Sequence, residues 1–198
     1  MMKHGFNTHR GRAHWEHVST MWKLDNSIIT LKVAPKLTRS HIFPNGFEKM
    51  RVDLVFHVFS PQVTRCLDFY KGQIEARYAK VGPTRLVIGL MVELIQVMTS
   101  RFPAEALRLH SRKEAVLDQP LKFLDLWEAH AKGLGCLSKS TAVGLRVTLQ
   151  STKHLLKYLA EEVHFKYLMT SRLSQDCLER FFGIVRQAGG GNDHPTPE

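Results

Sequence analysis

Two carboxylates near the C-terminal end have residue types and a spacing that catalysis could use. Asp176 and Glu179 lie three residues apart, just after Ser174, in a segment with helical periodicity. This spacing puts both on one face of a first helical turn, where the helix dipole favours negative charge. Carboxylate oxygens are also the ligands that Mg²⁺ prefers. The pair is therefore either part of a metal site or an ordinary solvated helix start, and the residues alone allow both.

A cluster of basic residues is the second candidate site. It lies near a turn signal at residues 44–46 and comprises Lys32, Lys36, Arg39, Lys49 and Arg51. These side chains could contact the phosphates of DNA or of a nucleotide, and the alternative is a solvated face. The formal net charge of +10 favours polyanions through counterion release, although no run of five like charges marks a nucleic-acid-binding tail.

Other chemistries find little support. The N-terminal histidines, His4, His9, His14 and His17, have no Cys or carboxylate partner at a recognised metal-site spacing. Cys66, Cys136 and Cys177 form neither a disulfide framework nor a CxxC pair, which favours a reducing, intracellular compartment. P-loop, Rossmann and nucleophile-elbow motifs are absent. The longest apolar run, residues 86–92, is too short to span a membrane, and no signal peptide is expected.

The first half of the chain is predicted to be helical after a poorly ordered start. Residues 1–13 are polar, basic and glycine-containing, which is typical of a disordered terminus. Apolar residues then recur at helical spacing over 15–26 and 47–58, and the stretch 27–33 favours an extended segment. Ser60 followed by Pro61 is a helix start signal for a helix that continues to about residue 74.

The second half is predicted to be helical as well. Residues 84–102 are apolar nearly all round, so they should form the central buried helix. Further helices are expected over 121–131, 140–164 and 174–187, with a linker at 133–138. The last helix should bury the face that carries Leu178, Phe181, Phe182 and Val185. The fold class is therefore mainly α, with a bundle-like arrangement.

The C-terminal segment also resembles a known family. The string SQDCLERFFGIVRQAGGGNDHPT closely resembles the closing motif of P-element and THAP-type DNA transposases. A weaker resemblance runs upstream through WEHVSTMWKLD, LKVAPKLTRSHI, MRVDLVFHVFS and VMTSRFPAEALR, and GLRVTLQSTKHLLKYL resembles the helix that leads back to the nuclease core. The resemblance implies a helical, GTP-binding-like insertion over 14–166 and a segment of an incomplete RNase H-like core over 167–198.

The resemblance also implies roles for particular residues. The family's RNase H-like core holds divalent metal with three acidic residues, and the insertion interrupts the core before the last of them. Glu179 matches that last catalytic, metal-binding carboxylate, and Asp176 matches a neighbouring acidic position associated with the nucleotide. In the family, the other two metal-binding residues are aspartates that lie upstream of the region matched here. Asp25, Asp53 and Asp125 of this chain are not in the matching context.

The nucleotide site departs from the family pattern. Where the family carries an Asp and, three residues later, an Asn, this chain has Gln96 and Thr99. An amide cannot replace a carboxylate as acceptor for both guanine N–H groups, because half of the amide is a donor. The family's cofactors are Mg²⁺ and GTP, and these residues support neither fully for the chain alone.

We therefore expect a nuclear fragment of a P-element-like transposase that is inactive alone and has DNA, at transposon ends, as a partner. A full-length transposase is a further expected partner, and a membrane is not. A truncated copy and a fragmentary gene model would both fit this expectation. The alternative is a domesticated, non-catalytic DNA- or protein-binding module, which a transcript that begins at Met1 would favour.

Overall fold

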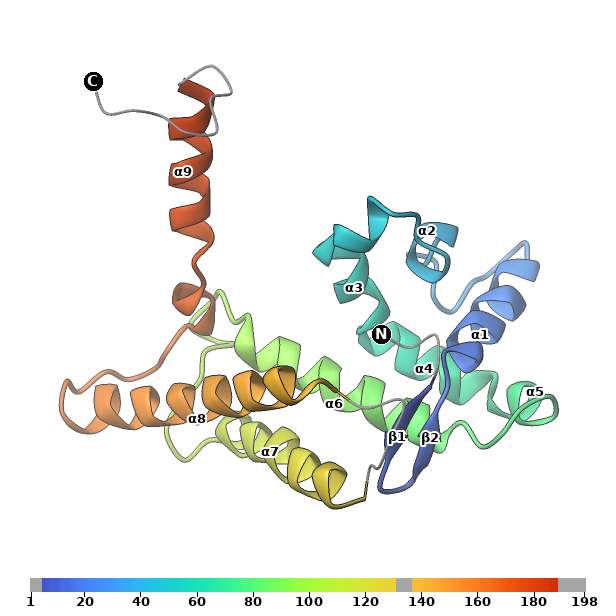
Figure 1. Cartoon of the computed structure of the whole chain (residues 1–198), viewed down its shortest axis with the longest axis horizontal. Helices are drawn as coiled ribbons and strands as arrows, with labels where there is room; N and C mark the ends of the chain where they lie inside the picture. Colours follow the sequence, from blue (N-terminus) through green and yellow to red (C-terminus); the bar gives the residue numbers. More distant parts are fainter. Residues whose placement is uncertain (1–4, 131–136, 189–198) are drawn as a thin grey trace.

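The chain is mainly α-helical in the computed structural model, which describes residues 5–130 and 137–188 (Figure 1). The N-terminal half contains β1 (Phe6–Thr8), β2 (Gly11–Ala13), α1 (Trp15–Ser27), α2 (Arg39–Ile42), the 3-10 turn η1 (Glu48–Met50), α3 (Val52–Val58), α4 (Pro61–Phe69) and α5 (Lys71–Glu75). The C-terminal half contains α6 (Gly82–Met98), α7 (Arg112–His130), α8 (Lys139–Glu161), the 3-10 turn η2 (Thr170–Leu173) and α9 (Asp176–Ala188). Most of the predicted linker and the glycine-rich C-terminal stretch lie outside the described residues.

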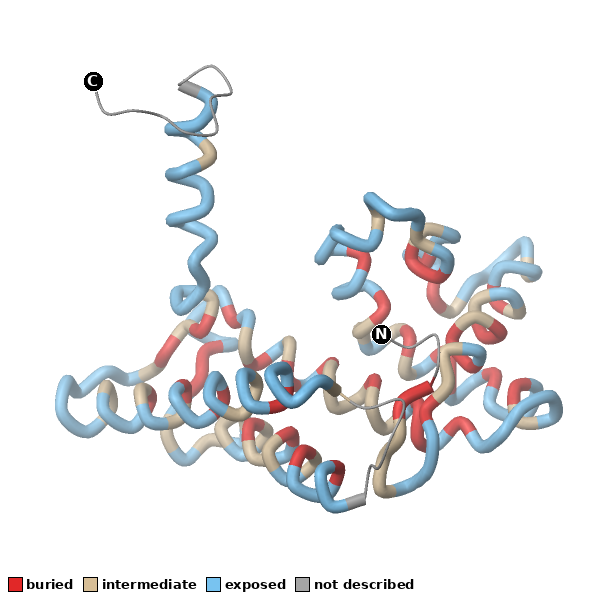
Figure 2. Tube along the Cα trace, in the orientation of Figure 1, coloured by how far each residue is buried: buried red, intermediate tan, exposed pale blue. Residues whose placement is uncertain are grey.

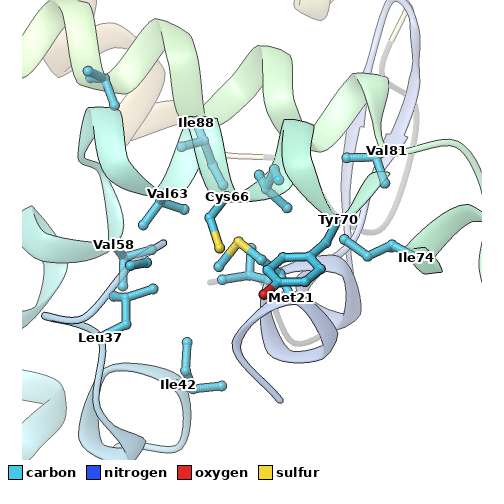
Figure 3. Packing of buried hydrophobic residues seen from close by; sticks show 14 residues of the cluster. Met21, Leu37, Ile42, Val58, Val63, Cys66, Tyr70, Ile74, Val81 and Ile88 are labelled. Carbon is cyan, nitrogen blue, oxygen red and sulfur yellow. The ribbon is translucent and has the colours of Figure 1, made fainter. Parts of the chain in front are cut away.

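Helix α6 is the central element, as its apolar sequence predicts. Its first half packs with α1 and α4 in one hydrophobic cluster, to which it contributes Ile88 and Val92. Figure 3 shows this cluster, to which α1 contributes Met21 and α4 contributes Val63. The second half of α6 belongs to another cluster with α7 and α8. No helix in the described part of the chain is both long and apolar enough to cross a membrane.

A buried carboxylate fixes the chain that follows α1. Asp25 is only 3% exposed and accepts hydrogen bonds from the backbone N–H groups of Val33 (2.8 Å) and Ala34 (3.0 Å), and from the Tyr70 hydroxyl (3.2 Å). Together with burial, which is the larger cause, this carboxylate raises the pKa of the neighbouring Cys66 thiol to about 12. The stretch predicted to be extended, 27–33, forms no strand, because Asp25 holds its end against α1.

The N-terminal residues differ from the prediction of poor order over 1–13. Residues 6–8 and 11–13 pair as an antiparallel hairpin. Phe6 is buried and stacks on Phe123 (6.2 Å between ring centroids) and on Trp127 (6.0 Å), both in α7. Local composition favours disorder here, but the aromatic partners lie more than a hundred residues away and supply the ordering energy.

Helix α7 is longer than predicted. The helix was predicted to start near Leu121, just after Pro120. In the structure it begins at Arg112 and continues through Pro120. Ion pairs connect α7 to α8: Lys153 with Asp118 (2.5 Å), and Arg146 with Asp125 (2.5 Å) and Glu128 (3.0 Å). Buried Leu117 and Leu124 compensate for the hydrogen bond that a helical proline removes.

Helix α9 does not bury its apolar face, contrary to the prediction. It projects away from the remaining helices, and its described residues are exposed apart from the half-buried Gly183 (Figures 1 and 2). The four residues expected to be buried, Leu178, Phe181, Phe182 and Val185, are 61%, 58%, 54% and 37% exposed. The helical periodicity is confirmed, but the described residues provide no surface that covers this face.

Candidate functional site

The two acidic residues lie in the first turn of α9. Ser174 Oγ accepts a hydrogen bond from the Asp176 N–H (3.0 Å), which starts the helix as the sequence predicts. The Gln175 side-chain amide donates to Glu179 Oε1 (2.7 Å), and both carboxylates are exposed. They therefore share the positive end of the helix dipole and are accessible to a ligand.

A reciprocal hydrogen-bond clasp connects the base of α9 to the end of α6. The Ser100 N–H donates to Thr170 Oγ1 and the Thr170 N–H donates to Ser100 Oγ, each at 3.1 Å. The Thr170 hydroxyl also donates to the Val97 carbonyl (2.6 Å), and both clasp residues are buried. This clasp was not predicted from the sequence, where the available signal is the tetrapeptide MTSR, present at 98–101 and again at 169–172.

The clasp brings the predicted nucleotide-site positions to the same region as α9. Gln96 and Thr99 lie in and just after the last turn of α6, next to Ser100, and both are exposed. The Thr99 hydroxyl donates to the Ile95 carbonyl (2.7 Å). Within the described residues, neither side chain forms a hydrogen bond with Asp176.

The donor set around Glu179 does not fit a two-metal centre. Mg²⁺ needs near-octahedral oxygen coordination, and a pair of ions about 4 Å apart needs several carboxylates. Glu179 and Asp176 supply two, and the Glu179 carboxylate already accepts from Gln175. Among residues 5–130 and 137–188, no group of three or more His, Cys, Asp or Glu side chains is arranged to hold a metal ion.

The predicted basic cluster lies around α2, η1 and α3. Lys36, Arg39 and Lys49 are exposed, and none forms an ion pair with another described residue. Arg51 is paired with Asp53 (2.6 Å), which raises the pKa of the guanidinium. Lys36 also lines a shallow groove of about 270 Å³ together with His57, Ser60 and Arg65, at the start of α4. The groove has the positive charge that a phosphate group would need.

A histidine pair that was not predicted from the sequence lies next to this groove, to which His57 contributes. His41 Nδ1 accepts from the Thr38 N–H (3.0 Å), so the proton of the neutral ring is on Nε2, which donates to His57 Nδ1 (2.9 Å). Burial and, secondly, the neighbouring His57 lower the pKa of His41.

A separate histidine, His17 in α1, also has a lowered pKa. Burial is the larger cause and the neighbouring His14 is the second, and the Nδ1 atom of His17 lies 2.7 Å from Thr84 Oγ1.

These lowered pKa values predict acid sensitivity in a defined window. Between about pH 6.5 and the lower folded-state values, the unfolded chain binds more protons at His17 and His41 than the folded chain does. The contribution of these two histidines to the free energy of unfolding should therefore be fully present above about pH 6.5 and should decrease as the pH drops below it. Urea denaturation at pH 7.5 and 5.5 measures this, and the midpoint should be lower at pH 5.5.

Variants separate the histidines from other groups. His41→Gln should reduce the difference between the two midpoints, whereas Gln73→Ala, which replaces an exposed side chain that does not titrate, should leave it unchanged. A midpoint that is equal or higher at pH 5.5 would contradict the prediction.

Comparison with known proteins supports the resemblance found in the sequence. Residues 1–109 match the family model of the TNP-like GTP-binding insertion domain, and residues 171–197 match that of the TNP-like RNase H C-terminal domain. The chain is 50% identical over 54 residues to the transposable element P transposase of Drosophila melanogaster, an alignment that covers 27% of this chain and 7% of that protein.

A solved structure has the same fold. It is the Drosophila P element transposase strand transfer complex, with a TM-score of 0.77 at 22% identity. The match covers 99% of this chain and 45% of that one, so the chain spans less than half the length of the solved relative. Because the insertion-domain model covers more than half of the chain and the closing motif matches as well, the chain belongs to the P-element-like transposase family.

Proposed function

We propose that this chain supplies Glu179 as the last metal-binding carboxylate of an RNase H-like transposase core, and Asp176 as a nucleotide-site carboxylate. The observation that carries the proposal is α9 itself, which presents both residues in its first turn within the segment that matches the RNase H C-terminal domain. DNA cleavage and joining require the remaining carboxylates. The chain alone is therefore not a nuclease.

The uncovered face of α9 supports this proposal. The apolar stripe of α9 is exposed, so covering it with another surface would lower the free energy of the protein. The remainder of an RNase H-like core, on the same or another polypeptide, is the surface that we propose. Association with a full-length transposase in the nucleus would provide it.

The basic cluster supports a role in holding DNA. The related solved structure is a strand transfer complex, and here Lys36, Arg39 and Lys49 have no competing ion pair among the described residues. We propose that these three residues, with Arg51, contact DNA phosphates. A nucleotide phosphate in the groove beside Lys36 is compatible with the same charges.

A non-catalytic binding module is the second candidate function. It is favoured by the donor set, because no group of three or more His, Cys, Asp or Glu side chains in the part of the chain that the structure describes is arranged to hold a metal ion. In that case the basic cluster and the face of α9 would retain binding without cleavage.

The isolated chain is expected to show no cleavage or strand transfer with Mg²⁺ or Mn²⁺. A single glutamate cannot hold two ions at the reacting phosphate. The measurement is gel analysis of labelled terminal-repeat DNA, with wild type and Glu179→Gln indistinguishable. Metal-dependent cleavage that disappears in Glu179→Gln would show that the active site is complete.

DNA binding is expected to be weak, salt-sensitive and largely independent of sequence. Affinity for a labelled duplex should fall steeply between about 50 and 200 mM salt. The triple variant Lys36→Glu, Arg39→Glu and Lys49→Glu should lower affinity at 50 mM salt by about tenfold or more, measured by fluorescence anisotropy.

A matched control has the same change in net charge. Reversal of Lys71, Arg77 and Lys80, which are exposed in and after α5, should reduce affinity much less. Equal losses of affinity in the two triple variants would mean that DNA binding depends on net charge and not on a localised site. If wild type does not bind DNA at low salt, the proposed DNA contact is excluded.

A further inference from the structure

The turn between α2 and α3 exposes large apolar side chains at an unusual level. Phe47 is 91% exposed, Met50 83% and Val52 61%, and Phe43 and Phe56 are both more than 40% exposed. Contiguous apolar exposure of this kind marks a binding surface in soluble proteins. We call residues 43–52 the Phe47 turn, which Figure 2 shows as a mostly exposed part of the chain.

The backbone of the Phe47 turn is held rigidly although its side chains are exposed. The Asn45 N–H donates to Glu48 Oε2 and the Glu48 N–H donates to Asn45 Oδ1, both at 2.8 Å. Ser40 Oγ donates to Glu48 Oε1 (2.6 Å), which fastens the turn to α2. These hydrogen bonds on both sides of Phe47 order the backbone that carries its exposed side chain, so less backbone entropy is lost when a ligand covers the ring.

Positive charge is interleaved with these apolar groups. Lys49 lies between Phe47 and Met50, Arg51 follows Met50, and Arg39 is next to Ser40, which contacts the turn. Glu48 keeps its negative charge, because the hydrogen bonds from Ser40 and Asn45 lower the pKa of its carboxyl, and both of its oxygens are turned toward these two donors. Arg51 is paired with Asp53, so Arg39 and Lys49 are the cations of this group without an ion pair among the described residues. An exposed aromatic ring beside such cations has the composition of a single-stranded nucleic-acid platform.

Three occupants can be compared on this basis. The centre of a protein interface is depleted in lysine, whereas Lys49 lies in the middle of the turn. A duplex offers phosphates to the cations, but its bases are already stacked inside and give Phe47 no partner. An unpaired strand offers both phosphates and free base faces. We infer that the Phe47 turn binds single-stranded DNA, with an unpaired base stacked on Phe47; this rests on the proposed contact of Lys36, Arg39 and Lys49 with DNA.

The test compares three labelled probes at 50 mM salt: a 12-nucleotide oligothymidylate, an abasic strand of equal length, and a 12-base-pair duplex. Wild type should bind oligothymidylate more tightly than the other two. Phe47→Ala should weaken binding of oligothymidylate by about 5- to 30-fold, and Phe47→Trp should retain it. Affinity for the abasic strand and the duplex should change less than about twofold in both variants, since neither probe offers a free base.

Phe69→Ala is the matched control, because Phe69 is 67% exposed and lies beside Asp68 in α4, outside the basic cluster. It should bind all three probes as wild type does. Unchanged oligothymidylate binding by Phe47→Ala, or an equal loss for the abasic strand and the duplex, overturns the base-stacking inference while the phosphate contact stands. If reversal of Lys36, Arg39 and Lys49 leaves all three affinities unchanged, the proposed DNA contact fails, and the inference fails with it.

Discussion

Replacement of Asp25 by alanine is expected to lower the free energy of unfolding by about 3 kcal/mol, a large share of the total for a domain of this size. The substitution removes the acceptor for two backbone N–H groups and for the Tyr70 hydroxyl, all in a site where Asp25 is 3% exposed. Buried donors left without an acceptor cost more than the hydrogen bond itself contributed. Urea denaturation followed by circular dichroism measures the change.

Asp68→Ala is the comparison variant. Asp68 also pairs with a partner in a defined geometry, Arg85 at 2.9 Å, but both side chains are about half exposed. An exposed ion pair contributes about 0 to 1 kcal/mol, so the loss should be within that range. Equal losses for the two variants would show that Asp25 is not a clamp for the chain after α1. Asp25→Asn should fall between them, because one half of the amide can still accept.

Introducing a carboxylate at residue 96 is expected to create a preference for guanine, if Gln96 occupies the position that the family resemblance assigns to it. Wild type should bind GTP weakly or not at all, with ATP competing nearly as well, because Gln96 and Thr99 cannot match the donor pattern of guanine. In the double variant Gln96→Asp, Thr99→Asn the ratio of GTP to ATP affinity should rise by about tenfold or more, since polar recognition of this kind discriminates strongly.

Calorimetric titration of both proteins with both nucleotides decides this prediction. Gln96 and Thr99 are both exposed at the end of α6, so the double variant should fold as wild type does. Lys36→Glu should weaken both nucleotides equally if the groove at α4 holds phosphate. Micromolar GTP affinity of wild type, with a tenfold preference over ATP, would mean that Asp176 alone recognises the base, or that Gln96 and Thr99 do not occupy the recognition positions.

The sequence predicted those parts of the fold that depend on neighbouring residues. Helix α4 begins at Pro61 as predicted, because a proline at the first helical position acts within one turn; Ser60 is the N-cap residue, although its side chain forms no capping hydrogen bond. Ser174 likewise predicts the start of α9, and the apolar run predicts α6 as the central helix. The family motif supplied the roles proposed for Asp176 and Glu179, which helix geometry alone could not separate from a solvated helix start.

The features that were missed depend on residues far apart in the sequence. The N-terminal hairpin is ordered by Phe123 and Trp127, and the clasp joins Ser100 to Thr170. The histidine pair joins α2 to α3, although His41 and His57 share no motif spacing. The apolar face of α9 was predicted to be buried because periodicity indicates that a face needs a partner, but periodicity does not say whether the partner is present.

The clasp has a mechanical consequence for Glu179. In the described part of the chain, α9 is attached only through the short segment that joins it to the clasp, so a bend just before Asp176 would tilt the whole helix. At a rise of about 1.5 Å per residue, the far end of α9 lies roughly 20 Å from its start, whereas Glu179 lies only about 5 Å from it. A tilt of about 20° would then move the far end by roughly 7 Å and Glu179 by less than about 2 Å. Such a bend would therefore displace the last turn of α9 by several ångströms, whereas Glu179 and its neighbour Leu178, close to the start of the helix, would move little.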